Sequence, residues 1–372
     1  MTVQGPGGSL ADVETVTAWL LDGVEAVAPV DMALADASGL IAANAVQAPH
    51  AVPDRDEAAL DGWALASADL VGASSYAPAM LAVPPSRIAV GAPMPEGCDC
   101  VVDAEWVEAD GPFAQVTCEA IPGEGVQRAG DDIAAGAGLL QPGQRISAFD
   151  IACARALGLA TLPVRRPRLR LVDLSSDGVR LTADLIAARA VAAGAETMRV
   201  TSERDAASIA AAMTGAADLV IVIGGTGAGL NDATPAALAQ AGALHAHGLA
   251  LRPGRTAAIG RIGRVPVVAL PGQPDHAMAG WLALGETLLA RLAGARPWPT
   301  VARPLTHKIS SAIGMVELAL LKRSDDDWTP LACGALPLAE MAAADAWCLV
   351  PASSEGHAAG TMLSGSLLHE AP

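Results

Sequence analysis

The sequence predicts a multidomain protein of mixed α/β and β class, in which a doubly wound α/β domain is joined to smaller β-rich parts. Between about residues 165 and 296, apolar strand patterns alternate with helical patterns, as in a parallel sheet covered by helices. Between about 80 and 150, short β-rich runs alternate with Pro and Gly turns, which is typical of a small β domain. The segment Arg296-Pro-Trp-Pro299 is a linker pattern, and residues 300–372 are a second short β-rich module.

Composition limits the function of the chain. Its 372 residues are enough for two or three domains with cores of their own. A net charge of −17 argues against nucleic acid or an anionic membrane surface as partner, because both bind basic patches. No apolar window is long enough to span a membrane, and no signal peptide is visible. The six cysteines lack Cys-x-x-Cys spacing, so we expect reduced thiols of a cytoplasmic protein and no zinc site.

The N-terminal part combines a helical pattern with two acidic turns. Residues 9–27 carry an apolar stripe at helical spacing, with Ser9 as a possible N-cap. Asp61-Gly62 and Gly130-Asp131-Asp132 are turn signals further along the chain. Each acidic turn taken alone is more often solvated than functional. A Mg²⁺ site would need carboxylates from several such loops at once.

The predicted α/β domain contains four apolar runs with the length and β-branched content of buried strands. The expected strands are 169–174, 196–200, 219–223 and 265–270, and the expected helices are 181–193, 206–213, 235–241 and 275–292. In doubly wound domains, ligands bind at the carboxyl ends of the strands. We therefore expect a binding site where the third and fourth strands end.

A glycine-rich turn follows the third strand. Ile223 is followed by Gly-Gly-Thr-Gly-Ala-Gly-Leu-Asn-Asp, ending at Asp232, and Thr234-Pro235 then opens a helical pattern. The order strand, glycine turn, helix N-terminus lets backbone N–H groups face an anion. A crossover turn without a ligand explains this loop equally well when it is taken alone.

Two further segments are expected near the same strand ends. Leu270 is followed by Pro271-Gly-Gln-Pro274, a rigid loop with free amides ahead of a helix. Arg252-Pro-Gly-Arg255 places two guanidinium groups around a turn, which suits phosphate. Combined with the acidic turns, these segments predict chemistry on a phosphoanhydride at a domain junction, with a metal ion neutralising the developing charge.

Six segments, in this order along the chain, resemble the molybdopterin molybdenumtransferase family, which includes MoeA and the E domain of gephyrin. No single segment is decisive, but six in order with compatible spacing are hard to obtain by chance. They are Ala59-Leu-Asp-Gly-Trp-Ala64, Gly91-Ala-Pro-Met-Pro-Glu-Gly97 with Asp99-Cys-Val-Val-Asp-Ala-Glu105, Arg128-Ala-Gly-Asp-Asp132 with Gly136, Gly224-Gly-Thr-Gly-Ala-Gly-Leu-Asn-Asp232, Arg252-Pro-Gly-Arg255, and Leu270-Pro-Gly-Gln-Pro274.

The resemblance implies an elongated cytoplasmic homodimer that inserts molybdate into adenylylated molybdopterin and releases AMP, with Mg²⁺ at the site. It implies an N-terminal helical and linking region (1–165) with an inserted β lid at about 75–145. A molybdopterin-binding α/β domain (166–296) and a C-terminal β domain (297–372) would follow. The site would lie between the α/β domain of one subunit and the N-terminal region of the other. An apo-molybdoenzyme or an upstream adenylyltransferase would be a protein partner.

Position by position, the resemblance also assigns roles to residues. Asp61, Asp132 and Asp232 would be catalytic, and Asp61 and Asp132 would reach across the dimer and bind the metal ion. The pterin and its phosphate groups would be held by two loops and two arginines, namely Gly224, Gly225, Thr226, Gly229, Arg252, Arg255, Pro271, Gly272, Gln273 and Pro274.

Several positions depart from the family's pattern. Arg252 and Arg255 stand where the family usually has Lys, and a planar guanidinium is not equivalent to a compact ammonium. Gln273 replaces an Asn. After the first strand of the α/β domain, Gly178 replaces an acidic Glu, and the loop that follows it is shortened to Arg180-Leu-Thr182. These changes affect molybdate and metal handling more than the fold.

Two functions of different classes are compatible with this pattern. The first is an active transferase with an altered site, supported by Asp61, Asp132 and Asp232. The second is a non-catalytic paralogue that binds or carries molybdopterin or the finished cofactor, motivated by Gly178. A nucleotide-binding hydrolase acting on another pterin or nucleotide is a third reading that only generic phosphate chemistry supports.

Overall fold

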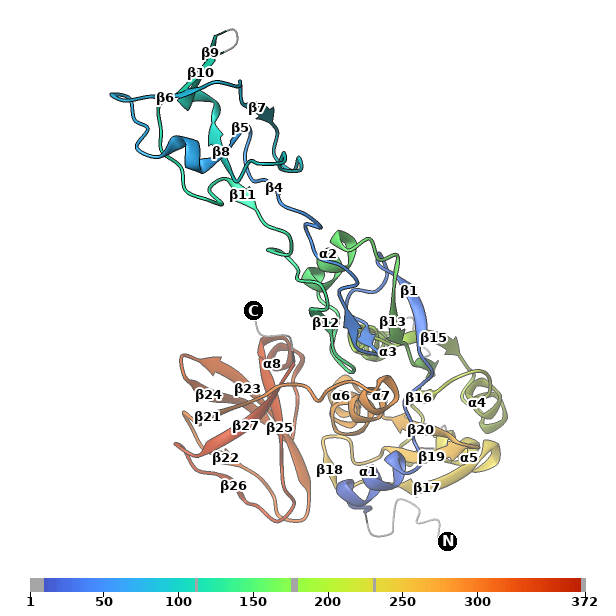
Figure 1. The fold of residues 1–372 in the computed structure, drawn as a ribbon. Helices are drawn as coiled ribbons and strands as arrows, with labels where there is room; N and C mark the ends of the chain where they lie inside the picture. The colour runs from blue at the N-terminus through green and yellow to red at the C-terminus, as the bar shows by residue number, and fades with distance from the viewer. Residues whose placement is uncertain (1–9, 111–112, 175–179, 230–231, 369–372) are drawn as a thin grey trace.

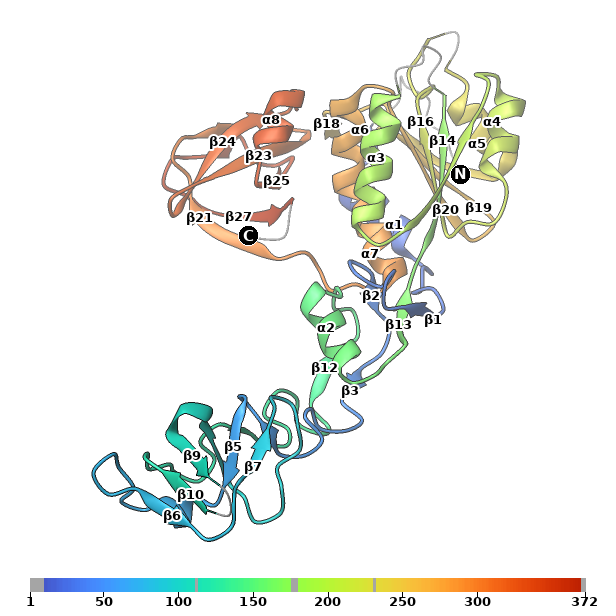
Figure 2. The same ribbon diagram turned by 90° about the horizontal axis from the view of Figure 1, so that it is seen from above.

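The computed structural model describes residues 10–110, 113–174, 180–229 and 232–368. Figures 1 and 2 show an elongated molecule, in which a small body of β-strands projects from a connecting segment away from two larger parts. One larger part is a helix-covered sheet, and the other is a C-terminal sheet beside it. No helix in the described part of the chain is long and apolar enough to cross a membrane.

The central sheet of the molecule has six strands in the order β15-β14-β16-β20-β19-β17. Its first four strands are parallel, and β19 and β17 are added antiparallel at one edge. The strands are β14 (Arg168–Asp173), β15 (Glu196–Thr201), β16 (Leu219–Ile223), β17 (Ala243–His247), β19 (Ala258–Ile262) and β20 (Val265–Leu270). The parallel strands confirm the doubly wound prediction, whereas the sequence does not predict the antiparallel edge.

Helices cover both faces of this sheet (Figure 2). On one face, α4 (Ala206–Met213) and α5 (Thr234–Ala241) pack around Val220 and Val222. The other face is covered by α1, α3 and the long helix that follows β20. Their bounds are α1 (Val13–Leu21), α3 (Leu181–Ala192), and α6 (Pro274–Gly280) continued through a π-helical segment (Trp281–Gly285) into α7 (Glu286–Ala293). The helix expected at 275–292 is therefore present but is interrupted by the π-helical segment.

The connecting segment consists of β1, β2 and β3, which lie within residues 30–47, and of β12, α2 and β13, which lie within residues 138–165. Strand β13 (Thr161–Arg165) lies between β1 (Val30–Ala33) and β2 (Ile41–Ala42), and β12 (Gly138–Leu140) pairs with β3 (Val46–Gln47). Helix α2 (Ala148–Ala156) packs beside them and is capped by Ser147. Asp12 caps α1, where the sequence suggests Ser9, a residue outside the described part of the chain.

The projecting β body comprises residues 57–127. Its strands are β4 (Glu57–Ala58), β5 (Gly62–Leu65), β6 (Ala79–Leu81), β7 (Ser86–Ile88), β8 (Cys100–Asp103), β9 (Val107–Asp110), β10 (Phe113–Val116) and β11 (Val126–Gln127). Strand β5 pairs with both β7 and β8, so the segment after Asp61 lies inside this body. The sequence places the insert later, at about 75–145, because Gly62 and Ala64 give β5 a weak strand pattern.

The C-terminal sheet borrows a strand from the preceding part of the chain. Strand β18 (Leu251–Arg252) pairs in parallel with β23 (Val316–Ser324), at one edge of the order β18-β23-β25-β27-β21. The other elements are β21 (Thr300–Pro304), β22 (Ile309–Ser310), β24 (Asp327–Cys333), α8 (Leu338–Ala343), β25 (Ala346–Val350), β26 (Gly356–His357) and β27 (Met362–Leu367). Leu318 and Leu320 share one hydrophobic core with α6 and α7, so the two larger parts pack together.

Candidate functional site at the carboxyl ends of the parallel strands

The glycine loop after β16 and the Pro-Gly loop after β20 touch each other. The amide of Gly224 donates a hydrogen bond of 2.8 Å to the carbonyl of Leu270. A side chain added at Gly272 would meet the Cα of Gly224 at 3.7 Å. The sequence predicts both loops at strand ends, and the structure brings them together as expected.

A pocket of about 280 Å³ opens where these loops meet the end of β14 and the start of α3. Of the predicted site residues, Gly224, Gly272 and Pro274 line it. The remaining lining comes from residues that sequence reasoning did not select: Asp173, Leu174, Arg180, Leu181, Thr182, Ala183, Arg204 and Ile223. The site is therefore richer in charged groups than the motifs alone indicate.

The glycine loop has a conformation that requires glycine. Gly224 and Gly225 have φ angles of +100° and +66°, in the region that disfavours side chains. A Cβ on Gly225 would lie 2.6 Å from the hydroxyl oxygen of Thr234. That hydroxyl donates to the carbonyl of Gly224 over 2.9 Å, and the amide of Thr234 donates to the carbonyl of Gly225 over 3.0 Å. The start of α5 is thereby fixed against the loop.

Asp232 and Thr226 stabilise the glycine loop from within. Oδ2 of Asp232 accepts a hydrogen bond of 2.8 Å from the amide of Gly229. Thr226 is buried, and its carbonyl accepts a hydrogen bond of 2.8 Å from Nε2 of His247. Neither Asp232 nor Thr226 is among the residues that line the pocket. In this structure both therefore shape the loop and do not face the cavity.

The two predicted phosphate-binding arginines lie outside this pocket. Arg252 is on β18, and its Nη1 lies 3.0 Å from Oε1 of Glu317, a carboxylate of the C-terminal sheet that is almost completely buried. Arg255 is exposed on the following turn. The pattern Arg-Pro-Gly-Arg is consistent with anion binding, but strand pairing with β23 directs Arg252 to a protein carboxylate instead.

The predicted acidic turns are far from the pocket within one chain. Asp61 is exposed on the β body, where its Oδ1 accepts a hydrogen bond of 2.8 Å from the amide of Val90. Asp132 is exposed beside the connecting segment. Figures 1 and 2 show that the strands β4 and β5 next to Asp61 lie well away from β16 and β20. Across the described residues, no group of three or more His, Cys, Asp or Glu side chains could hold a metal ion.

Charged side chains are arranged asymmetrically around the pocket. Asp173, 1% exposed, accepts a hydrogen bond of 2.7 Å from Arg199. Burial lowers the pKa of Arg199, but hydrogen bonds to Asp184 and Asp173 outweigh that effect and raise it above its ordinary value. Arg199 therefore stays charged and shares its charge between Asp173 and Asp184. Arg180 also approaches Asp173, at 4.0 Å, and Arg204 donates from Nε to the carbonyl of Leu174 over 3.1 Å.

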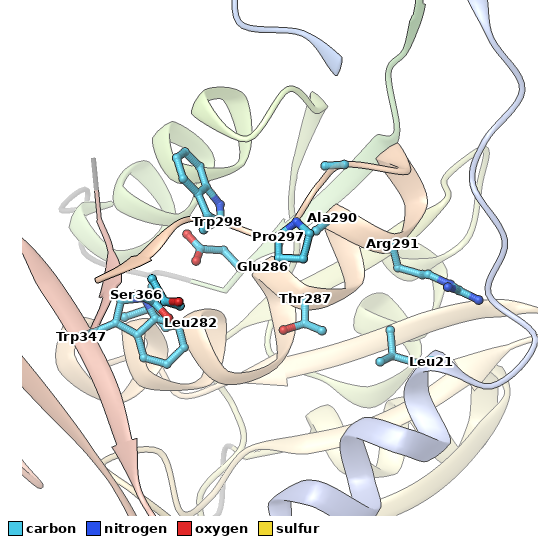
Figure 3. A pocket seen from close by; sticks show the side chains of 12 residues that line it. Leu21, Leu282, Glu286, Thr287, Ala290, Arg291, Pro297, Trp298, Trp347 and Ser366 are labelled. Carbon is cyan, nitrogen blue, oxygen red and sulfur yellow. The ribbon is translucent and has the colours of Figure 1, made fainter. Parts of the chain in front are cut away.

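A larger cavity than this pocket lies elsewhere, at the junction of α1, α7 and the C-terminal sheet. It has a volume of about 400 Å³, and Leu282, Trp298 and Trp347 contribute to a mainly apolar lining (Figure 3). Its buried carboxylate, Glu286, is paired with Arg189 of α3. We assign the functional site to the smaller pocket because glycine loops and unequal charges converge there, whereas the junction has the composition of an interdomain contact.

Cysteine chemistry is not part of this site. All six cysteines are free thiols, and none lines the pocket. Burial raises the pKa of Cys100, Cys333 and Cys348 to about 12, so these three are protonated at neutral pH. The Gly178 substitution singled out in the sequence lies outside the described residues.

Comparisons with known proteins agree with this geometry. Residues 11–158 match the family described as "MoeA N-terminal region (domain I and II)", and residues 179–291 match "Probable molybdopterin binding domain". The chain is 31% identical over 299 residues to "Molybdopterin molybdenumtransferase 2" of Mycobacterium tuberculosis, covering 69% of this chain and 74% of that protein. It is 26% identical over 325 residues to "Molybdopterin molybdenumtransferase" of Haemophilus influenzae, covering 76% and 78%.

A solved structure shares the fold of this chain. A crystal structure of the "molybdopterin biosynthesis moea protein" from Pyrococcus horikosii superposes with a TM-score of 0.74 at 24% identity, covering 96% of this chain and 99% of that one. A parallel sheet with a ligand-sized pocket between two glycine-containing loops defines a binding protein of the doubly wound class. The chain belongs to the molybdopterin molybdenumtransferase family.

Proposed function

We propose that this protein inserts molybdenum into adenylylated molybdopterin and releases AMP. The observation that carries the proposal is the pocket between Gly224 and Gly272, which lies in the region that matches a molybdopterin-binding domain. In that reaction, water cleaves the phosphoanhydride to give AMP and the pterin phosphate, and the two dithiolene thiols bind molybdate through sulfur while their protons leave with one oxide of molybdate as water. The family relationship supports a role in molybdenum cofactor biosynthesis.

The residues of the pocket suit binding and orientation of this substrate. Absence of side chains at Gly224 and Gly225 lets the phosphate groups approach the backbone, as in other glycine-rich anion sites. Thr182 donates from Oγ1 to the carbonyl of Gly272 over 2.7 Å, which fixes the Pro-Gly loop against α3. Pro271 and Pro274 then restrict that loop through their fixed φ angles, so the opposing wall is held before the ligand arrives.

The acidic residues enter the proposal through a second subunit. Within one chain, the β body that carries Asp61 lies well away from β16 and β20, so we propose a homodimer in which the partner copy brings its Asp61 and Asp132 to this pocket. The described residues of a single chain do not provide a Mg²⁺ site. Mg²⁺ therefore belongs to the proposal only as an ion held between subunits.

The wider setting of the proposal is a cytoplasmic enzyme with small-molecule substrates. The acidic chain, at −17, gives no support for nucleic acid or an anionic membrane surface as partner. We propose an upstream adenylyltransferase and an apo-molybdoenzyme as protein partners. We also propose that the domain boundaries of the chain lie at about residues 165 and 296. A non-catalytic carrier remains the alternative, but relatives that are named transferases favour the enzyme.

The test of this function is AMP release from adenylylated molybdopterin by the purified protein with Mg²⁺ and molybdate. We expect molybdate-dependent release that Asp61→Ala abolishes. Asp54→Ala is the matched control, because Asp54 is an exposed carboxylate of the same region that pairs with its neighbour Arg55. Tight pterin binding without AMP release would establish the carrier instead, and neither binding nor release would overturn both readings.

A mixing experiment tests the shared site. Two inactive variants, Asp61→Ala and Gly225→Val, are refolded together so that heterodimers form. In a heterodimer, one of the two sites would contain both intact residues, and activity would return. No recovery in verified heterodimers would show that Asp61 and Gly225 do not act in one intersubunit site.

A further inference from the structure

Two arginines that no family motif marks face the pocket, while the two that the motifs mark do not line it. Arg180 and Arg204 line the pocket together with Gly224 and Gly272. Arg252, by contrast, is paired with the buried Glu317. The cationic groups at the strand ends therefore differ from those that the sequence suggests.

Arg180 occupies a position where a positive charge is locally unfavourable. It is the N-cap of α3, and its side chain makes no capping hydrogen bond. Ser, Thr, Asp and Asn are preferred at this position, and the partial positive charge of a helix N-terminus repels a cation. A residue that breaks a local rule in this way is expected at a functional site. An anion in the pocket would be attracted by both the guanidinium group and the helix end.

Arg204 is anchored with its guanidinium edge at the pocket. Its Nε donates to the carbonyl of Leu174, the residue after β14, which is itself a lining residue. This hydrogen bond restricts the side chain and leaves the two Nη groups to act as donors. Among the described residues, no carboxylate pairs with Arg204. Its charge is therefore not neutralised by this part of the protein.

Among the described residues, the lining of the pocket carries more positive than negative charge. Its charged members there are Asp173, Arg180 and Arg204, and Asp173 pairs with Arg199 and, at 4.0 Å, with Arg180. Two fork-shaped donors on a site with small glycine walls match a compact oxyanion with several acceptor oxygens. A cationic ligand would be repelled by this arrangement.

We propose that Arg180 and Arg204 form a clamp for a tetrahedral oxyanion at the strand-end pocket. This inference rests on the proposed function, in which such an anion is available from two sources: the pterin phosphate of the substrate, or free molybdate. The clamp takes the part that the Arg252-Pro-Gly-Arg255 segment is expected to play. It is a binding and positioning device and does not itself break a bond.

The test is direct binding of inorganic phosphate and of molybdate to the full-length protein by calorimetry at low ionic strength. Arg180→Gln and Arg204→Gln each weaken binding about 10- to 100-fold, as expected for loss of a charge-assisted hydrogen bond. Two matched controls keep wild-type affinity. Arg252→Gln removes the arginine paired with Glu317, and Arg168→Gln removes one paired with Asp218 at the opposite end of β14.

Each outcome decides the proposal. Loss of molybdate binding alone assigns the clamp to the metal oxyanion, and loss of phosphate binding assigns it to the pterin phosphate. Binding that survives in the Arg180→Gln/Arg204→Gln double variant, or that is lost in Arg252→Gln, overturns the clamp. So does wild-type protein that binds neither anion at millimolar concentration.

Failure of the clamp and failure of the proposed function are distinguishable. If AMP release is intact but the double variant retains the wild-type KM, the enzyme reading stands and the clamp is wrong. If anion binding depends on both arginines but AMP is never released, the clamp stands and the transferase reading is wrong. Circular dichroism of each variant confirms that the fold is retained, because both side chains are exposed.

Discussion

The strand-end pocket and the junction cavity are opposites in size and chemistry. The first, at about 280 Å³, is bounded by glycine loops and arginines, and the second, at about 400 Å³, by tryptophans and aliphatic side chains. At the junction, the buried Glu286 forms an ion pair with Arg189, which links α7 to α3. At the strand ends, Arg204 has no carboxylate partner among the described residues. The strand-end pocket is therefore distinguished from the junction cavity by an arginine without a carboxylate partner among the described residues, and not by its volume.

The difference predicts that changes at the junction affect stability and changes at the strand ends affect activity. At the junction, Arg189 donates to the carbonyl of Leu368 as well as pairing with Glu286, so α3, α7 and the C-terminal sheet are held by one guanidinium group. At the strand ends, the loops are held by uncharged contacts between backbone groups and the hydroxyl groups of Thr182 and Thr234, and by the carboxylate of Asp232.

The largest effect is expected from Glu286→Ala at the junction. Removing one partner of a buried ion pair leaves Arg189 buried without its counter-charge, which costs about 3–5 kcal/mol of unfolding free energy. Urea denaturation measures this loss, while AMP release per folded molecule stays near wild type. Glu286→Gln keeps a hydrogen-bond acceptor and serves as the milder control. A loss of activity without a loss of stability would place the junction in the catalytic machinery and break the comparison.

Gly225→Val at the strand ends is expected to have the reverse signature. The new side chain collides with Thr234 at a backbone φ of +66°, so the glycine loop must shift. A displacement of about 1 Å near the reacting groups lowers turnover by about 100-fold. Gly263→Ala, at a turn with a similar φ but open space around it, is the control for backbone strain alone. Equal turnover in both variants would remove the glycine loop from the site.

Thr182→Val is expected to have a smaller effect on the same pocket. It deletes the hydrogen bond to the carbonyl of Gly272, a loss of about 1 kcal/mol. Because the Pro-Gly loop is then less restricted, KM for adenylylated molybdopterin should rise by about fivefold with kcat little changed. Thr182→Ser, which retains the hydroxyl, should restore the wild-type KM. Failure of serine to do so would mean that the methyl group, and not the hydrogen bond, matters.

The smallest effect is a pH dependence of stability at α1, the helix whose Leu21 lines the junction cavity. Trp19 of α1 stacks on His245 at 3.9 Å between ring centroids. Burial, aided by the nearby Arg261, lowers the pKa of His245 below its ordinary value of about 6.5. A lowered pKa stabilises the fold above pH 6.5, and that contribution is lost as pH falls through the folded-state value. The melting temperature of the wild-type protein should therefore decline slightly as the pH is lowered. The decline should be smaller in His245→Phe, which has no imidazole to protonate.

Sequence patterns predict those features that are local. The strand 219–223 is observed with the same bounds, because its β-branched run has no other stable location than a buried strand. The antiparallel edge is missed because β17 (Ala-Leu-His-Ala-His) and β19 (Ala-Ile-Gly-Arg-Ile) mix apolar residues with His, Arg, Ala and Gly and so lack a continuous β-branched run. Gly260 in particular approaches the carbonyl of Ala243 too closely for any side chain, so its role is visible only after pairing.

For the site, too, sequence patterns predict only the residues whose positions are set locally. Gly224, Gly272 and Pro274 are predictable because each belongs to a turn at the end of a strand. Arg180 and Arg204 follow different strands, and no spacing rule connects them to each other. Only the parallel pairing of β14 with both β15 and β16 brings their loops to one edge. The ion pair of Arg252 with Glu317 likewise depends on strand pairing across the linker.

The borrowed strand β18 limits how this protein can be rearranged genetically. A gene fragment cut at residues 295–299 would separate the C-terminal module from a strand that its own sheet needs. The excised module would expose the backbone of β23 to other chains, and the remaining fragment would keep a strand without a sheet. Module exchange between homologues would therefore need to carry residues 251–252 along with 300–368, a non-contiguous unit that simple recombination does not transfer.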